Sequence, residues 1–310
     1  MQEKQYEVVT IGAGPTALTA AIYTTREDIE TVLLEKGVIG GLAATTDWID
    51  NYPGFPDGIS GIDLSENLRK QAERFGAKID LAEVSDVSYE DGLVKLSTTD
   101  GQISAKAVLI ATGSDYKKLG IPGETEYYAR GVHYCATCDG AFYRDKKIAV
   151  VGGGNSAVQE ALFLTKFASS VDLLVRSDKF RASDVLLHEL EKNDKITVHM
   201  NTTTDEIVGN YQFVNKVIGT DKLANKKVEF DVDGVFIFIG LLPNTGFLNG
   251  KVELDEIGLI KTDDQLKTNI QGVFAAGDVR SGATMQIASA VGEGATAAMR
   301  IREYLDSLPK

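Results

Sequence analysis

Two cysteines give this sequence its clearest candidate for chemistry. Cys135 and Cys138 are the only cysteines among 310 residues, and the two-residue gap between them is short enough for a reversible disulfide. In a reducing compartment, such a pair is more often catalytic or metal-binding than a structural crosslink. Asp139 follows Cys138 directly, where a carboxyl group could carry a proton to or from a departing thiolate. The alternative role for Asp139 is to cap a turn beside Gly140.

A zinc site is another use to which cysteines are put. Zinc takes about four ligands at such a site, and only His133, His188 and His199 could join the two cysteines. His133 stands two residues before Cys135, which is too close for the usual spacing of ligands. We therefore favour redox chemistry without a metal and interpret the histidines as structural or surface residues.

A phosphate-binding turn follows the cysteine pair. The apolar run Lys147–Val151 predicts a strand, and it leads into Gly152–Ala157, whose sequence is Gly-Gly-Gly-Asn-Ser-Ala. The residues from Val158 to Phe167 then predict a helix. In a unit of this kind the glycines permit a tight turn, and the helix N-terminus faces a pyrophosphate. The redox pair therefore lies next to a nucleotide site in the sequence.

The strand that completes this second unit ends in a cation. Val171–Val175 predicts the strand, Arg176 comes next, and Arg181 follows five residues later. A guanidinium group can bind the 2′-phosphate of a nucleotide, which favours NADP in this unit. The alternative is that both arginines are ordinary surface charges.

The same pattern occurs at the start of the chain, with an acid in place of the cation. Tyr6–Ile11 predicts a strand, Gly12–Ala17 forms the turn Gly-Ala-Gly-Pro-Thr-Ala, and Leu18–Arg26 is compatible with a helix. The next strand, Thr31–Glu35, ends in a carboxylate, which hydrogen-bonds the free hydroxyls of a ribose. This unit therefore suits the ribose of an FAD-type cofactor. A simple glycine-rich turn would explain the glycines but not the acid.

The rest of the chain continues the alternation of strand and helix signals. Further strands are expected within residues 79–98, 107–110, 228–232, 234–239 and 272–278, and helices within residues 65–75 and 286–305. The fold class is therefore predicted to be α/β, with two Rossmann-like dinucleotide-binding domains.

Composition excludes several other classes of protein. The length suits roughly two domains. A net charge of −13, with no cluster of lysine and arginine, argues against nucleic acid as a partner. The N-terminus lacks the apolar core of a secretory signal, and no apolar run approaches the ~20 residues that span a bilayer. We expect a cytoplasmic protein without a membrane partner.

Taken together, these motifs resemble the low-molecular-weight thioredoxin reductases, which are FAD-containing pyridine nucleotide-disulfide oxidoreductases. The resemblance covers nearly the whole chain and depends on the order and spacing of seven motifs. These are Gly12-Ala13-Gly14-Pro15, Gly40-Gly41, Asn51-Tyr52-Pro53-Gly54, Ala111-Thr112-Gly113, Cys135-Ala136-Thr137-Cys138-Asp139-Gly140, Gly152-Gly153-Gly154-Asn155-Ser156-Ala157 and Ala275-Ala276-Gly277-Asp278. It implies a bound FAD, NADPH as electron donor, thioredoxin or a thioredoxin-like protein as substrate, and a homodimer.

The resemblance also implies a division into domains. Residues 1–114 and 243–310 would form a discontinuous FAD-binding domain, and residues 115–242 would form an NADPH-binding domain that carries the disulfide. Electrons would pass from NADPH through FAD to Cys135–Cys138 and on to thioredoxin. Because the disulfide must face the flavin and then the partner, the crossings near Ser114–Tyr116 and Leu242–Pro243 would act as a hinge.

Site residues follow from the resemblance by position. Cys135, Cys138 and Asp139 would be catalytic. A helix beginning near Ile287 would direct backbone N–H groups at the flavin edge that gains negative charge. The FAD site would comprise Gly12, Gly14, Pro15, Thr16, Glu35, Lys36, Gly40, Gly41, Leu42, Asn51, Gly113, Gly277, Asp278, Gln286, Ile287 and Ala288. The nicotinamide nucleotide site would comprise Gly152, Gly154, Asn155, Ser156, Arg176 and Arg181.

Two departures from the family pattern bear on this reading. Leu42 stands where the family usually has glutamine, and Val175-Arg176-Ser177-Asp178-Lys179-Phe180-Arg181 replaces His-Arg-Arg-x-x-x-Arg. A lost charge-assisted hydrogen bond is worth about 1.5–3 kcal/mol, so the preference for NADPH over NADH could fall roughly ten- to a hundredfold. NADPH remains favoured, with NADH or ferredoxin as alternative electron donors.

Three other functions compete with a disulfide reductase. A flavoprotein of the same fold that passes electrons to ferredoxin usually lacks the cysteine pair. A peroxiredoxin-reducing flavoprotein ordinarily carries an extra N-terminal redox domain, and we identify none before Tyr6. A nucleotide-sensing module without catalysis is the third alternative, and turnover of a small disulfide would exclude it.

Overall fold

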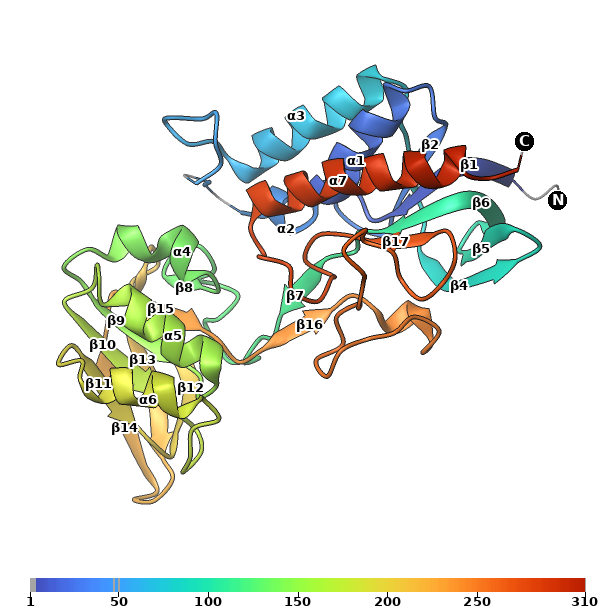
Figure 1. Cartoon of the computed structure of the whole chain (residues 1–310). Coiled ribbons are helices and arrows are strands. Elements are labelled where there is room, and N and C mark those ends of the chain that lie inside the picture. Colours follow the sequence, from blue (N-terminus) through green and yellow to red (C-terminus); the bar gives the residue numbers. More distant parts are fainter. Residues whose placement is uncertain (1–3, 47, 50, 310) are drawn as a thin grey trace. The chain divides into compact units, whose positions relative to one another are not determined.

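The computed structural model describes residues 4–46, 48–49 and 51–309. The chain divides into two compact units, which are described separately below. The first comprises Met1–Asp115 and Leu242–Lys310, and the second comprises Tyr116–Leu241 (Figure 1). The first unit is therefore built from two stretches of sequence, between which the whole second unit is inserted.

The first unit is organised around a mixed sheet. Its strands run in the order β3-β2-β1-β6-β5-β4, and β17 also pairs with β6. The β1, β2, β3, β6 and β17 pairings are parallel, whereas β4 and β5 form an antiparallel extension on β6. The first half of β6 pairs with β5 and its last residues pair with β17. The bounds are β1 (Lys4–Ile11), β2 (Thr31–Glu35), β3 (Lys78–Leu81), β4 (Val84–Glu90), β5 (Leu93–Thr98), β6 (Gly101–Ile110) and β17 (Val273–Ala275).

Helices α1 (Pro15–Thr25), α3 (Gly61–Arg74) and α7 (Ile287–Asp306) pack together over one face of this sheet (Figure 1). Small side chains let α1 and α7 approach closely, because a Cβ at Gly294 would lie 2.3 Å from Thr16 O. The Ser60 hydroxyl caps α3 by accepting from the Asp63 N–H. This packing fixes the N-terminal ends of α1 and α7 in one unit.

The opposite face of the sheet is covered by a second apolar cluster. Strand residues such as Val9 and Val108 share this cluster with Leu248 and Ile260, which belong to the return stretch of the chain. That stretch is largely irregular and includes a short 3₁₀ helix, η2 (Gly246–Leu248). A separate four-residue helix, α2 (Gly41–Ala44), follows β2. With both faces buried there, the second halves of the central strands β1 and β6 are largely apolar.

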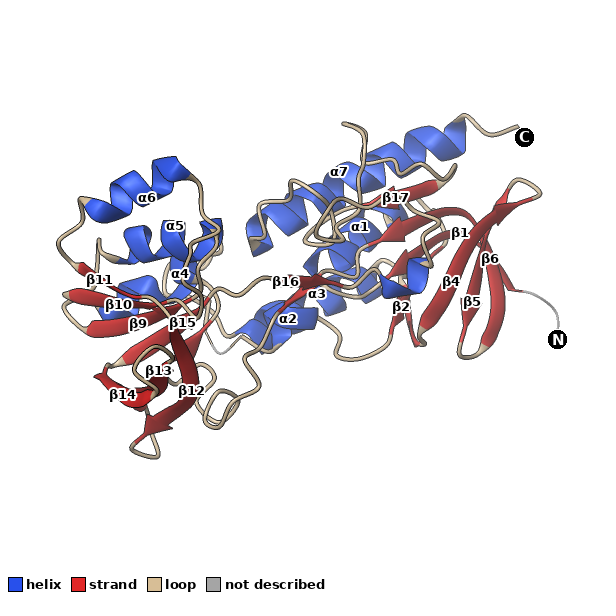
Figure 2. Ribbon diagram, turned by 90° about the horizontal axis from the view of Figure 1, so that it is seen from below, coloured by secondary structure: helices blue, strands red, loops and turns tan. Residues whose placement is uncertain are grey.

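The second unit has a parallel sheet with the strand order β11-β10-β9-β15-β8. Helices α5 and α6 pack against one face, and an antiparallel sheet of β12, β13 and β14 covers the other (Figure 2). The bounds are β8 (Val132–His133), α4 (Ala136–Asp139), η1 (Gly140–Tyr143), β9 (Lys147–Val151), α5 (Asn155–Leu164), β10 (Ser170–Leu174), α6 (Asp184–Glu191), β11 (Ile196–His199), β12 (Thr202–Gly209), β13 (Val214–Asp221), β14 (Lys226–Asp231) and β15 (Gly234–Ile237).

The two crossings between the units pair with each other. β7 (Ser114–Tyr116) and β16 (Leu241–Pro243) form a two-stranded sheet. Rotation about this ribbon stays a prediction. No helix in the described part of the chain is long and apolar enough to cross a membrane.

Candidate redox and nucleotide-binding sites

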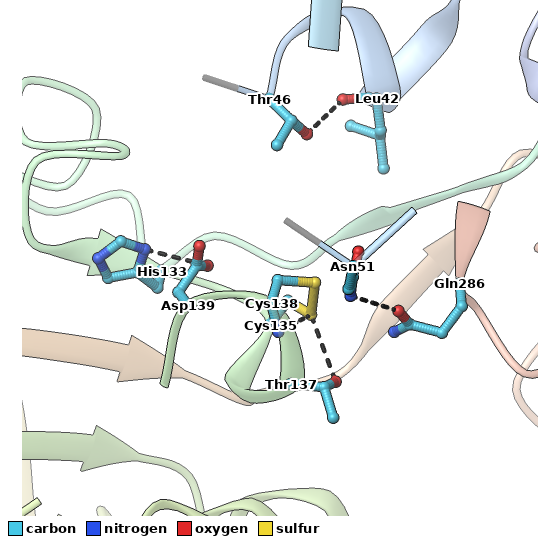
Figure 3. The surroundings of a disulfide bond; sticks show 9 residues. All are labelled: Leu42, Thr46, Asn51, His133, Cys135, Thr137, Cys138, Asp139 and Gln286. Carbon is cyan, nitrogen blue, oxygen red and sulfur yellow. Dashed lines mark hydrogen bonds and ion pairs between the residues drawn. A yellow bond between two sulfur atoms is a disulfide. The ribbon is translucent and has the colours of Figure 1, made fainter. Parts of the chain in front are cut away.

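The two cysteines are joined as a disulfide in the second unit. Their Cα atoms are 5.4 Å apart, Cys135 is the N-cap of α4, and Cys138 lies within that helical turn. The Cys138 N–H donates to Cys135 Sγ at 3.2 Å, and Thr137 Oγ1 lies 3.6 Å from the same sulfur (Figure 3). Both cysteines are partly exposed. A turn that holds two sulfurs together, with a donor at one of them, can support reversible disulfide exchange.

Asp139 ends the same helical turn and faces a buried histidine. Its Oδ2 lies 3.1 Å from His133 Nδ1 (Figure 3). Asp139 also precedes η1, but its side chain makes no capping hydrogen bond there. The carboxyl group of Asp139, the residue after Cys138, is therefore held by the His133 side chain.

The turn between β1 and α1 has the geometry of a phosphate cradle. Gly12 has a φ of 102°, and a Cβ there would lie 2.5 Å from Ala111 O, so glycine is required. Gly14 is the N-cap of α1, and a Cβ on it would have no neighbour within 4 Å. Pro15 occupies the first helical position, where no N–H is needed. Free N–H groups beside open space suit a pyrophosphate.

Glu35 closes this turn from the end of β2. Its Oε2 accepts from the Ala13 N–H at 2.8 Å, and its Oε1 accepts from the Gly37 N–H at 2.7 Å. The Gly40 N–H donates to Ala13 O at 2.8 Å, which ties the next loop to the same turn. The following residue, Lys36, is exposed. The carboxylate predicted to bind ribose hydroxyls therefore lies against the phosphate turn.

The turn between β9 and α5 repeats this construction in the second unit. Gly152 has a φ of 146°, and a Cβ there would lie 2.3 Å from Phe238 O. Gly154 is the N-cap of α5 and has open space around it. Asn155 Oδ1 accepts from the Ser183 N–H at 2.8 Å, and Ser156 is exposed in the first turn of α5. The second cradle is therefore bounded by the loop that follows β10.

Cations gather around this second turn. The Arg181 N–H donates to Gly153 O at 2.7 Å, so Arg181 lies beside the turn, and its side chain is exposed. Arg176 lies two residues after the end of β10 and is also exposed. Lys222, which follows β13, donates from Nζ to Arg176 O at 2.8 Å. This region of the unit can therefore attract an anionic group.

In the first unit, a half-buried carboxylate, Asp278, lies between β17 and α7 in the sequence. Burial, and secondarily the charge of Glu293, raises the pKa of Asp278 to about 6. Glu293 Oε2 accepts from the Gly277 N–H at 2.8 Å, and Glu293 is also paired with Arg280 through Oε1 at 2.5 Å. The Asp278 carbonyl accepts from Ser114 Oγ at 2.6 Å. The backbone around Asp278 is therefore held by hydrogen bonds. A hydrogen bond from a hydroxyl group would stabilise the Asp278 carboxylate.

The N-terminus of α7 supplies the other predicted flavin contacts. Gln286 is its N-cap without a side-chain capping bond, and Gln286 Oε1 accepts from Asn51 Nδ2 at 3.1 Å (Figure 3). Ile287 and Ala288 open the helix. The Leu42 side chain is exposed, and its carbonyl accepts from Thr46 Oγ1. Gly113 has a φ of 65°, and its carbonyl accepts from the Asn244 N–H.

The chain matches a known family over almost all of its length. A family model described as pyridine nucleotide-disulphide oxidoreductase matches residues 6–294. The chain belongs to this family. A thioredoxin reductase of Bacillus subtilis (strain 168) is 41% identical over 307 residues, which cover 99% of this chain and 97% of the relative. A thioredoxin reductase of Treponema pallidum (strain Nichols) is 40% identical, and the match covers 99% of both chains.

A solved structure agrees with these relatives. The crystal structure of thioredoxin reductase from Streptococcus pyogenes MGAS5005 has a TM-score of 0.94 and 39% sequence identity, and the match covers 99% of this chain and 100% of that one. These findings confirm the family and the fold class predicted from the sequence. The roles of individual site residues in this oxidoreductase stay predictions.

The structure brings the predicted residues together in three groups. Cys135, Cys138 and Asp139 form one group, and the second turn with its arginines forms another within the same unit. The third group lies in the first unit, at the carboxyl ends of its parallel strands, where ligands of α/β sheets bind. Its members come from the first turn, the end of β2, Gly113, the Gly277–Asp278 turn and the start of α7.

Four contributors to these groups were missed in the sequence. His133 and Tyr143, whose hydroxyl lies 2.7 Å from His133 Nε2, flank the cysteine motif in sequence. No spacing rule connects a histidine with an aspartate six residues later. Lys222 lies beyond the three strands β11, β12 and β13, so only the folded unit brings it to Arg176. Glu293 could have been found by helical phase, because it lies two turns after Gln286 on α7.

Replacing Asp278 with asparagine is expected to flatten the pH dependence of the flavin-free protein's stability. Because the pKa of Asp278 is raised from 3.8 to about 6, the folded protein holds this proton more tightly than the unfolded chain. The free energy of unfolding therefore falls as pH rises from about 4 to about 6, by at most about 3 kcal/mol. The stabilisation is complete below the lower value and lost above the higher one.

Urea unfolding of the flavin-free wild type and Asp278→Asn across this pH range measures the effect. The variant is expected to gain stability relative to the wild type as pH rises through about 6. Parallel stability curves for the two proteins would contradict the prediction.

Proposed function

We propose that this oxidoreductase is an FAD-containing thioredoxin reductase that uses NADPH as its electron donor. The observation that carries the proposal is the Cys135–Cys138 disulfide, held in a partly exposed turn beside Asp139. The same unit contains a glycine turn with cations around it, and the relatives named thioredoxin reductase match almost the entire chain. Reduced nicotinamide and a protein disulfide are therefore the proposed substrates.

The first unit fits a flavin dinucleotide. Gly12, Gly14 and Pro15 would admit the pyrophosphate at the start of α1, and Glu35 would accept from the adenosine ribose. Asp278 is a half-buried carboxylate whose pKa is raised, which suits a hydroxyl donor from the ligand. The backbone of Ile287 and Ala288 would direct N–H groups at the ring edge that gains electrons. When bound, the flavin supplies the two-electron carrier between nicotinamide and disulfide.

NADPH is the proposed donor because cations lie on the loop that borders the second turn. Arg176 and Arg181 are exposed next to it, and Lys222 lies against the Arg176 backbone. Lys222 is a candidate to replace the arginine that Ser177 has displaced from the family motif. A 2′-phosphate would gain charge-assisted hydrogen bonds here that a free hydroxyl would not.

Replacing Arg181 with alanine is expected to raise the KM for NADPH by about ten- to a hundredfold. The KM for NADH should stay within about twofold, because that coenzyme lacks the 2′-phosphate. Stopped-flow reduction of the flavin with each coenzyme measures both. Lys192→Ala is a matched control, since Lys192 is an exposed cation that ends α6 in the same unit. Equal increases in the KM values for NADPH and NADH would show that Arg181 does not bind the 2′-phosphate.

The cysteines and Asp139 would carry out the transfer to thioredoxin. A cysteine thiolate attacks the partner's disulfide, and the second cysteine resolves the mixed disulfide. Asp139 would take the proton from a cysteine thiol and return it to the thiolate that leaves the partner. Rotation about the β7–β16 ribbon is proposed to let the disulfide serve both flavin and partner.

Anaerobic titration of the purified protein tests this function. NADPH should bleach the flavin and release two thiols, and the reduced protein should then reduce thioredoxin. Bleaching by NADH at equally low concentration would overturn the NADPH assignment, and bleaching by reduced ferredoxin alone would replace both coenzymes. A colourless protein, or failure to reduce any thioredoxin, would overturn the proposed function itself.

We also propose a homodimer as the working assembly. Sedimentation or light scattering of the flavin-loaded protein measures its mass directly. A mass close to the 33.4 kDa of one chain would contradict this assignment.

A further inference from the structure

His133 is a buried residue with a partner at each ring nitrogen. Its Nδ1 lies 3.1 Å from Asp139 Oδ2, and its Nε2 lies 2.7 Å from the Tyr143 hydroxyl. The ring stacks on Phe236 with centroids 5.1 Å apart and meets Tyr143 edge-on at 5.3 Å. His133 is 7% exposed and belongs to β8, which is paired with β15. Its ring therefore has one fixed orientation.

The Tyr143 hydroxyl determines where the histidine carries its proton. Burial, followed by the charges of Asp139 and Asp233, raises the pKa of Tyr143, so the phenol keeps its proton. Lys146 is the charged group on the other side, with Nζ 5.5 Å from the Tyr143 ring centroid. A protonated phenol donates to Nε2, which leaves the proton of a neutral imidazole on Nδ1. That Nδ1–H then donates to Asp139 Oδ2.

We propose that His133 is a positioning residue for Asp139 in disulfide exchange. The inference rests on the proposed function, in which Asp139 exchanges protons with the sulfurs. The Nδ1–H holds Oδ2 and fixes the rotamer of Asp139 beside Cys138, which leaves Oδ1 to exchange protons. An unheld carboxylate on a one-turn helix would sample several rotamers, whereas this one is held in a single orientation next in sequence to Cys138.

Counting the protons in the exchange shows which proton transfers the positioned Asp139 would carry out. One cysteine thiol gives its proton to Asp139, and the thiolate forms a mixed disulfide as the partner's S–S bond breaks. The partner thiolate that leaves takes the proton from Asp139. The second cysteine thiol then loses its proton through the same carboxylate, closes Cys135–Cys138, and releases the second partner thiol. Two protons therefore pass through Asp139 in each turnover.

A second histidine–aspartate pair in the same unit provides a control. His199 Nε2 lies 2.7 Å from Asp172 Oδ1, and the His199 ring meets Phe230 edge-on. Both pairs combine an imidazole, a carboxylate and an aromatic ring, but the His199 pair joins β11 to β10 and includes no residue adjacent to a cysteine. A role in folding alone would make the two pairs equivalent.

A double-mutant cycle on thioredoxin turnover tests the proposal. The variants are His133→Leu, Asp139→Asn and the double variant, with kcat and KM for thioredoxin measured at saturating NADPH. His133→Leu is expected to lower kcat about tenfold at unchanged KM, and to cause no further loss in the Asp139→Asn background. His133→Asn retains a donor near the Nδ1 position and should keep kcat within about threefold of the wild type. His199→Leu should leave kcat unchanged.

The outcomes separate the inference from the function on which it rests. If His133→Leu lowers kcat by the same factor in the wild-type and Asp139→Asn backgrounds, the positioning role is overturned. A kcat of His133→Asn as low as that of His133→Leu would also overturn it. If His133→Leu does not fold, Tyr143→Phe, which removes the donor to His133 Nε2, forms the cycle with Asp139→Asn, and additive losses there would again overturn the positioning role. Full turnover by Asp139→Asn alone would instead remove the proposed role of Asp139.

Discussion

Serine at both Cys135 and Cys138 is expected to lower thioredoxin reduction at least about a thousandfold while NADPH still bleaches the flavin. Hydroxyl groups cannot form the disulfide that receives electrons, yet serine is close to cysteine in size. Both cysteines lie in a partly exposed turn outside the apolar clusters, so the second unit should fold as before. The expected protein is coloured, takes up two electrons where the wild type takes up four, and does not turn over thioredoxin.

Single replacements identify the order of attack. The variant that keeps the attacking cysteine should trap thioredoxin as a stable mixed disulfide, because its resolving partner is gone. Non-reducing electrophoresis after incubation with thioredoxin detects this adduct. Thr137→Ala is a suitable control, since Thr137 is exposed and lies near Cys135 Sγ without forming a disulfide. Turnover of thioredoxin by the double-serine protein would refute the assignment of the redox centre.

The parts of the fold that could be predicted from sequence are those in which local and global signals agree. β1 and β9 end in short apolar runs next to glycine turns, and the side chains of these runs are buried on both faces of a parallel sheet. The helices after both turns are expected from the sequence to begin at Leu18 and Val158, but they begin earlier, at Pro15 and Asn155, because a glycine of each turn is the N-cap. Helix α3 also begins earlier than its amphipathic pattern indicates. Its start is set by the Ser60 cap and by the close packing of Gly61 under α2.

Other elements gave weak signals because much of their surface faces solvent. α6 has a single buried residue, Leu190, and the strands β11 and β12 are mixed in polarity. A register shift between Thr204 and Glu206 also breaks the alternation in β12. These elements form because they cover a sheet that is already apolar, which is a tertiary effect. Contacts such as Lys222 with Arg176 depend on that tertiary arrangement and have no local signature.

One alanine variant in each glycine turn gives a pair of predictions, and each variant serves as the control for the other. Gly152→Ala is expected to abolish flavin reduction by NADPH while the protein keeps its flavin. Gly12→Ala is expected to lose the flavin while NADP⁺ still binds. In both cases the added Cβ would press on a backbone oxygen, Phe238 O at 2.3 Å or Ala111 O at 2.5 Å, at a φ that favours glycine. The turn would have to shift away from the strand that supports it, which removes the cradle for phosphate.

Dithionite separates a lost coenzyme site from a misfolded unit. Gly152→Ala whose flavin is reduced by dithionite should still reduce thioredoxin, because Cys135, Cys138 and Asp139 lie on β8–α4 and not on the altered turn. For Gly12→Ala, titration calorimetry with NADP⁺ should give a Kd within about threefold of the wild-type value, since Gly12 and Gly152 belong to different compact units. If Gly152→Ala accepts electrons from NADPH at the wild-type rate, the second turn is not the coenzyme site. Loss of both flavin and NADP⁺ binding in either variant would mean that the two turns do not serve separate ligands.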